Sequence, residues 1–174
     1  MREQGDKYAD CIMYSEHMEF PKNRPIPWIA NFSDRRDMGN FYSVHWNMPI
    51  SDEEAKAAGA AVGHPPHMHK ENEIMFLIGM DPNDPYELGA AVEICIGDTM
   101  EKHIITRTCC LNIPANTPHG FYRITKCSRP WMFFQVQEAN PRTEKFLWEY
   151  LTQEEIASIP ERLKPLWVDT GYDD

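Results

Sequence analysis

Three histidines stand within one six-residue segment of the chain, at His64, His67 and His69. His67 and His69 are two residues apart, so on a β-strand both side chains point to the same face, with Cα atoms about 6.6 Å apart. Two imidazoles placed in this way can bind one metal ion. The competing interpretation is a histidine-rich turn at the protein surface.

Glu73 and His119, which come later in the chain, are candidates to complete such a metal site. Glu73 begins an apolar run, but four residues of straight strand would place it about 13 Å from His69. The chain must therefore turn at residues 70–72, and Glu73 would face the histidines from the neighbouring strand. His119 begins a later apolar run and could close the site from a third strand. Three imidazoles and one carboxylate suit a borderline divalent ion (Fe²⁺, Mn²⁺, Ni²⁺, Cu²⁺ or Zn²⁺) and leave a position open for water or substrate.

Arg123 is the candidate catalytic residue beside this site. It shares strand parity with His119, which predicts that both side chains point into the same interior. A guanidinium in an apolar interior needs an anionic partner. Two partners are open: the carboxylate of Glu93, or a substrate carboxylate or phosphate held by two parallel hydrogen bonds. Gln135 and Gln137, on a later strand, are further hydrogen-bonding groups.

The other histidines have less defined roles. The two prolines between His64 and His67 favour polyproline II, in which residues three apart lie about 9 Å from each other. His64 is therefore expected at the mouth of the site or in a structural role, and not as a joint ligand. His45 either lines the cavity or belongs to the opposite face of its strand. His17 and His103 stand among charged residues and are expected at the surface.

Short strands separated by turns would have to position these residues. Seven apolar, β-branched or aromatic runs lie between turn residues, at 41–48, 73–78, 90–96, 103–108, 110–113, 119–124 and 131–136. Many short strands with frequent turns are typical of an antiparallel sandwich or barrel. Two capping boxes, Ser51-x-x-Glu54 and Thr152-x-x-Glu155, predict short helices, and Pro160 is expected to interrupt or end the second.

Length and composition narrow the class of protein. The 174 residues predict one domain with a β core at about 26–140, an N-terminal extension at 1–25 and a C-terminal extension with short helices at 141–174. A net charge of −10 argues against a nucleic-acid-binding protein. The longest apolar run, 74–80, is too short to span a membrane, and the first ten residues lack a secretory signal. These features predict a cytoplasmic protein that binds neither membranes nor nucleic acid.

The five cysteines do not form a metal-binding or redox motif. None of them belongs to a C-x-x-C pair, which excludes zinc-ribbon and thioredoxin-like spacings. We expect reduced thiols buried as small apolar side chains, with a reactive thiol as the alternative. They are Cys11, Cys95, Cys109, Cys110 and Cys127.

The first histidine segment resembles the first metal-binding motif of the cupin superfamily, G-x5-H-x-H-x3/4-E-x6-G. His67, His69 and Glu73 match its centre. The glycine framework departs from the pattern, since Gly79 stands one residue early and Ala61 replaces the opening glycine. The resemblance therefore lies in the metal-binding centre of the motif.

A second segment resembles the second cupin motif, G-x5-P-x-G-x2-H-x3-N. Pro114 and His119 match it, and Asn116 replaces the inner glycine; asparagine is the residue that best tolerates left-handed backbone geometry after glycine. Thr108 and Arg123 stand where the first glycine and the final asparagine would be. The two motifs together cover residues 61–123.

The resemblance implies an all-β fold, a double-stranded β-helix or jelly roll, with one metal ion inside the barrel mouth. The implied ligands are His67, His69, Glu73 and His119. One motif pair indicates a monocupin with one divalent transition metal per chain, iron being preferred.

Cupins include oxygenases, decarboxylases, isomerases, lyases and proteins that only bind ligands, so the fold does not fix the chemistry. The complete ligand set favours a metal-dependent enzyme that acts on a small polar, carboxylated metabolite by dioxygenase or by non-redox lyase, isomerase or decarboxylase chemistry. The alternative is a non-catalytic cupin that binds a metal and a small ligand. The many aromatic residues, five Trp and eight Phe among them, further predict a homodimer.

Overall fold

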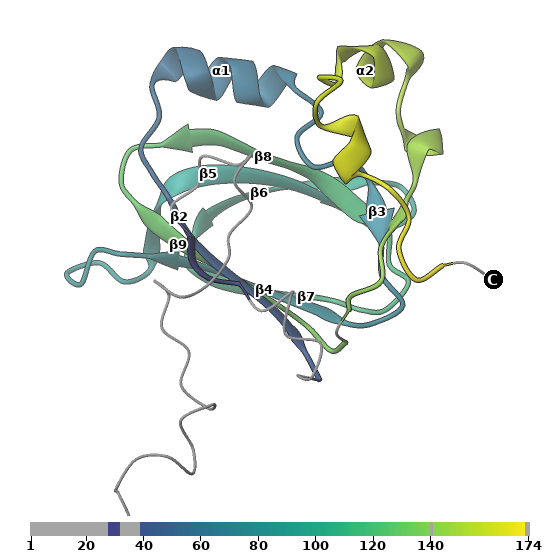
Figure 1. The fold of residues 1–174 in the computed structure, drawn as a ribbon. Coiled ribbons are helices and arrows are strands. Elements are labelled where there is room, and N and C mark those ends of the chain that lie inside the picture. The colour runs from purple at the N-terminus through teal and green to yellow at the C-terminus, as the bar shows by residue number, and fades with distance from the viewer. Residues whose placement is uncertain (1–27, 32–38, 140, 173–174) are drawn as a thin grey trace, which may run out of the picture.

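The structure is a computed structural model that describes residues 28–31, 39–139 and 141–172. Two five-stranded antiparallel sheets face each other across a common interior (Figure 1). The predicted N-terminal extension, together with Cys11 and His17, lies outside the described residues.

The two sheets have the strand orders β1-β2-β9-β4-β7 and β10-β3-β8-β5-β6. The strands of the first sheet are β1 (Trp28–Asn31), β2 (Phe41–Asn47), β9 (Trp131–Gln137), β4 (Glu73–Gly79) and β7 (Cys109–Ile113). The strands of the second are β10 (Lys145–Phe146), β3 (His67–Met68), β8 (His119–Cys127), β5 (Glu87–Ile96) and β6 (Glu101–Arg107). Each of the seven predicted runs is a strand, and the predicted double-stranded β-helix is confirmed.

Side chains that alternate along the strands fill the interior between the sheets. Met75 and Leu77 of β4 meet Val92 and Ile94 of β5 there, and Trp131 of β9 closes the same cluster. The period of two explains the arrangement, because every second residue of a strand points to the same face. The first residue of this inward row on β4 is Glu73, so the sequence places a carboxylate at the end of an otherwise apolar row.

Both predicted helices form behind complete capping boxes. Helix α1 (Asp52–Ala60) begins where the Ser51 hydroxyl accepts a bond from the Glu54 amide, and the Glu54 carboxylate accepts one from the Ser51 amide. Helix α2 (Gln153–Ser158) begins in the same way at Thr152. Both helices lie over the sheet that contains β8 and β5 (Figure 1). None of the described helices is long and apolar enough to cross a membrane.

The C-terminal segment, predicted as an addition to the core, also contributes to the sheet. Its strand β10 pairs with β3 in antiparallel register, with Phe146 opposite His67. The short 3-10 helices η3 (Trp148–Tyr150) and η4 (Lys164–Leu166) follow it. A second apolar cluster forms where this segment meets the outer face of the second sheet, and it contains Val62, Cys95, Phe121, Phe146, Leu151, Ile159 and Trp167.

The four cysteines in the described part of the chain are free thiols. Cys95 and Cys127 are buried, as expected of small apolar side chains, and burial raises the pKa of both thiols. Cys109 and Cys110 point to opposite faces of β7, so that Cys109 is half-buried and Cys110 is exposed.

Candidate metal centre

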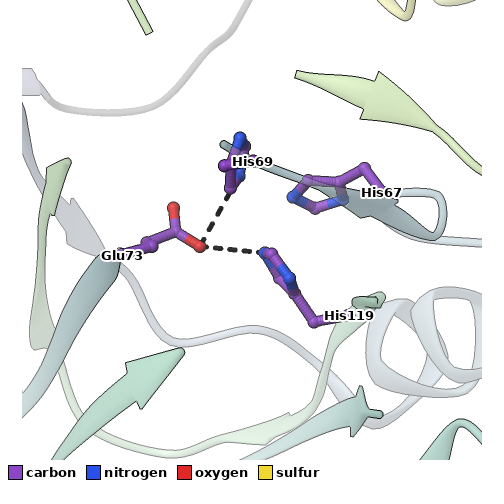
Figure 2. A group of neighbouring side chains, drawn as sticks. All are labelled: His67, His69, Glu73 and His119. Atoms are coloured by element: carbon purple, nitrogen blue, oxygen red, sulfur yellow. Dashed lines mark ion pairs between the residues drawn. The ribbon is translucent and has the colours of Figure 1, made fainter. Parts of the chain in front are cut away.

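Both sheets contribute to a buried cluster of three histidines and one glutamate (Figure 2). His67 on β3 is paired directly with His119 on β8, and His69 follows β3. Glu73 begins β4 in the facing sheet, so it approaches the histidines across the interior and not from a strand beside theirs. The ligand atoms of these four residues all lie within 4.8 Å of one another.

All three histidines bond a backbone carbonyl through Nδ1. His67 Nδ1 lies 2.7 Å from the Pro65 carbonyl oxygen, His119 Nδ1 lies 2.9 Å from that of Thr117, and His69 Nδ1 bonds that of Thr143. A carbonyl oxygen only accepts hydrogen bonds, so each of these contacts requires a proton on Nδ1. The lone pair of each neutral imidazole is then on Nε2, the arrangement that metal-binding histidines usually adopt.

The carboxylate of Glu73 is oriented by two amide side chains. Gln135 and Gln137, which point from the neighbouring strand β9, both donate to Glu73 Oε1, and the second of these bonds measures 3.3 Å. The other oxygen, Oε2, lies 2.9 Å from His119 Nε2 and 3.8 Å from His69 Nε2 (Figure 2). The two glutamines therefore fix one oxygen and turn the other toward the histidines.

Burial and mutual charge set the protonation of the cluster. Burial lowers the pKa of His69 to about 4, and burial together with the charges of His119 and His64 lowers the pKa of His67 well below its ordinary value. Burial alone would raise the pKa of Glu73, but bonding to His119 and the nearby imidazoles lower it to about 2. At neutral pH His67 and His69 are therefore neutral imidazoles and Glu73 is an ionised carboxylate, the forms that bind metal ions.

The geometry around Glu73 Oε2 calls for a cation. With its proton on Nδ1, His119 turns an Nε2 lone pair toward a carboxylate oxygen only 2.9 Å away, and two such atoms repel each other unless a cation joins them. A proton can take that place: burial by itself lowers the pKa of His119, but Glu73 raises it above the ordinary value. The buried donor set of three nitrogens and one oxygen equally fits a divalent transition metal.

Removing the amide that holds Glu73 should weaken metal binding without removing a ligand. We expect Gln135→Met, which keeps the length of the side chain, to lower metal affinity about 10–100-fold, the effect typical of groups that orient a ligand. Competition with a chromogenic chelator measures it. The matched control is Gln153→Met on exposed helix α2, and equal affinities in both variants would contradict the orienting role.

Arg123 does not point in the same direction as His119, because β8 contains a bulge between them. Phe121 has a positive φ of 51°, and the register of β8 against β5 shifts at this position. Beyond the bulge Tyr122 packs against the interior cluster, while Phe121 joins the outer one. The parity argument was therefore wrong, since it assumed an uninterrupted strand.

Of the two partners considered for Arg123, the structure shows the protein carboxylate. Its Nη1 lies 2.6 Å from Glu93 Oε1, and its guanidinium lies over the Phe121 ring at 4.8 Å. The other oxygen of Glu93 bonds Lys102 at 3.0 Å. The side chain still borders the cavity described below, so a catalytic role of Arg123 stays a prediction.

A substitution separates the structural role of Arg123 from a catalytic one. Arg123→Met removes a charged hydrogen bond whose two side chains are 13% and 9% exposed, so the free energy of unfolding should fall by about 1–3 kcal/mol. Chemical denaturation measures the change, and metal content should equal that of the wild type. The control Arg129→Met breaks the more exposed pair with Asp81 and should cost less than about 1 kcal/mol. A stability equal to that of the wild type would contradict the structural role.

His64 lies much nearer to the cluster than its spacing predicted. Its Nδ1 is 3.2 Å from His67 Nδ1, and the centroids of the two rings are 4.4 Å apart. His64, His67 and Glu144 form a second group whose ligand atoms lie within 4.8 Å of one another. The objection that His64 is too far from His67 to share an ion was therefore wrong. His103, in contrast, is exposed on β6 beside Glu101, as expected.

A cavity of about 560 Å³ adjoins the cluster. His67, Glu73 and His119 line it. His45 lines it as well, and lining the cavity was one of the two roles considered for this residue. Tyr122 also lines it, although no sequence motif identified this residue, since only the bulge in β8 turns it inward.

Arg142 is a second cavity residue that the motifs did not identify. It belongs to the segment predicted as a C-terminal extension, and its Nη2 lies 3.0 Å from Glu144 Oε2. Together with the Thr143 carbonyl that bonds His69, it shows that this segment forms part of the site. Two nearby charged residues such as Arg142 and Glu144 do not indicate in the sequence that their segment lies beside a metal cluster.

No protein-family model and no curated protein sequence matches the chain. Among solved structures, it is similar to an oxalate oxidase in complex with the substrate analogue glycolate, with 14% identity over 97% of this chain and 78% of that one and a TM-score of 0.48. It is also similar to a conserved protein with a double-stranded β-helix domain from Klebsiella pneumoniae, with 11% identity over 78% and 95% of the two chains and a TM-score of 0.43. A third is the DMSP lyase DddQ from Ruegeria pomeroyi, with 14% identity over 66% and 46% and a TM-score of 0.39, so the chain spans less than half of that protein.

Proposed function

We propose that this protein is a metal-dependent enzyme that acts on a small molecule. The proposal rests on a double-stranded β-helix of the cupin superfamily with a buried cluster of histidines and a glutamate in its interior. His67, His69, Glu73 and His119 are the proposed ligands of one divalent transition metal per chain. The observation that carries the proposal is the set of three Nδ1 bonds to backbone carbonyls, which leave three Nε2 atoms available beside one oriented carboxylate oxygen.

The residues around the ligands have separate tasks in this proposal. When bound, the metal would supply one of two kinds of chemistry: it would act as a Lewis acid that polarises a coordinated oxygen, or as a redox centre beside which O₂ reacts. Gln135 and Gln137 hold Glu73 in place by donating to Oε1, and the bonds from His119 and Gln135 lower the pKa of its carboxyl group. Arg142 also lines the cavity, and the guanidinium N–H groups that do not bond Glu144 could donate to a substrate with a carboxylate or another anionic oxygen group.

The reaction class follows from the metal, and iron is the ion we propose. Three imidazoles and a carboxylate suit iron and leave positions for a substrate and O₂, which favours dioxygenase chemistry. Zinc, nickel or manganese in the same ligands would favour a non-redox lyase, isomerase or decarboxylase.

One experiment tests both the metal and the reaction class. The protein is purified without oxygen and its metal content is measured by mass spectrometry. O₂ uptake and loss of substrate are then followed against a panel of carboxylates that extends from small polar to aromatic compounds. Iron with substrate-dependent O₂ uptake supports a dioxygenase. Bound metal with no turnover of any substrate would support the alternative, a non-catalytic binding protein, and absence of metal would contradict the proposal.

A further inference from the structure

Most of the surface of the cavity beside the cluster is apolar, although about half of the residues that line it have polar side chains, among them Ser43, Asn47 and Gln135. Beyond Glu73, the inward rows of the strands present Met75, Ile94, Ile124 and Phe133, all of which line it. A volume of about 560 Å³ is in the range of sites for ligands much larger than a two-carbon acid. A small polar metabolite would leave most of this apolar surface in contact with water.

The hydroxyl of Tyr122 is a polar atom in this apolar wall. It is buried and has no hydrogen-bond partner among the described residues. The Tyr122 ring packs edge-on against Phe133 at 5.6 Å. A buried hydroxyl without a partner is costly, so such groups in native proteins generally bond a water molecule or a ligand. Burial also raises the pKa of Tyr122 well above its ordinary value, so the hydroxyl stays a donor at neutral pH.

The Tyr122 backbone is bridged to His64 beside the cluster, whereas the Tyr122 ring packs against Phe133. Phe133, against which it packs, is in register with Leu77 of β4. Leu77 is four residues, about 13 Å, beyond Glu73 on the same strand. Met75, which lies between Glu73 and Leu77 on β4, and Ile94 of β5 both line the cavity with apolar side chains. A ligand that reaches from the cluster to the level of Phe133 must therefore be longer than a small carboxylate and apolar in its middle.

We propose that the cavity takes an amphipathic ligand: an oxygen-chelating head at the cluster, an aromatic or similarly bulky apolar body, and a hydrogen-bond acceptor for the Tyr122 hydroxyl. The inference deepens the proposed function and rests on it for the head group. It replaces the small polar metabolite that the sequence analysis predicted with a larger, mainly apolar one.

Calorimetric titration of the zinc-loaded protein with acetohydroxamate and benzohydroxamate tests the apolar body. Both probes chelate through the same group and differ only in a methyl or a phenyl substituent. We expect benzohydroxamate to bind at least about tenfold more tightly, because its ring leaves water. Equal affinities, or tighter binding of acetohydroxamate, would overturn the inference and leave the metal site intact.

A second pair of probes tests the Tyr122 hydroxyl. 4-Acetylbenzohydroxamate and 4-ethylbenzohydroxamate have nearly the same shape, but only the first carries an acceptor on the ring. We expect the wild type to prefer the acetyl compound at least about fivefold, and Tyr122→Phe to abolish that preference. The matched control Tyr42→Phe removes a hydroxyl that bonds Asn40 outside the cavity, and it should keep the preference. A preference that survives Tyr122→Phe, or is absent from the wild type, would overturn the assignment.

Failure of the metal site is distinguished by probes that do not chelate. If the protein does not bind zinc, the proposed function fails. The inference is then decided by the binding of acetophenone and ethylbenzene, which have no chelating group and need only contacts with the apolar side chains of the cavity to bind. Binding of both, with acetophenone favoured in the wild type but not in Tyr122→Phe, supports it. Binding of neither overturns it.

Discussion

Replacing His69 with alanine is expected to remove nearly all bound metal, from about one ion per chain to less than about 0.1 after gel filtration. His69 is fully buried, and its Nδ1 bond to the Thr143 carbonyl leaves only Nε2 to bind an ion beside Glu73. Alanine leaves three ligands and a space that water fills, so the site binds the metal ion more weakly and the ion is lost to the solvent. Mass spectrometry of the purified variant measures the occupancy.

Two other histidine variants control this result. His103→Ala removes an exposed imidazole on β6, and we expect its metal content to equal that of the wild type. His64→Ala removes a neighbour of His67 that also belongs to the second group with Glu144. Full occupancy in His69→Ala together with loss in His64→Ala would show that the ion sits in this second group and that the ligand assignment is wrong.

Removing the metal from the wild type is expected to lower the thermal midpoint by about 8–16 °C. The ligands come from β3, β8 and β4 in two facing sheets, so the bound ion cross-links the barrel and only the folded chain assembles the site. A ligand present at about a thousand times its dissociation constant stabilises the folded state by about 4 kcal/mol. For a chain of this length, 1 kcal/mol corresponds to about 2–4 °C.

Scanning calorimetry with and without a chelator measures this shift. The metal content is checked in both samples, and the metal is added back to show that the change is reversible. His69→Ala is the control, because a chain that holds no metal should show no shift with chelator. An unchanged midpoint after verified removal of the metal from the wild type would mean that the site does not stabilise the fold.

The strands, the capping boxes and the placement of His67 and His69 on one side of the chain could be predicted from the sequence because each depends on local rules. Alternation along Glu73–Gly79 decides which side chains point inward whatever the partner strand is. A capping box such as Ser51 with Glu54 closes within four residues. The spacing of His67 and His69 likewise places two imidazoles on one side of the chain without reference to the rest of the molecule.

Other features were decided only by the tertiary structure. The bulge at Phe121 turns Arg123 toward Glu93 and brings Tyr122 into the cavity, and the residue types in this strand do not reveal where the register shifts. The sequence also did not indicate that the segment after residue 140 supplies β10 and the Thr143 carbonyl.

The physical reason for this division is the range of the interactions. Strand alternation, capping and the spacing of His67 and His69 are fixed by covalent geometry over a few residues, so they indicated an antiparallel sandwich or barrel, and the motif resemblance added the jelly roll and the four candidate ligands. The pairing of His67 with His119, the approach of Glu73 from the opposite sheet and the orientation of its oxygens by Gln135 depend on contacts between residues about 50 to 60 positions apart, which only the packed barrel brings together.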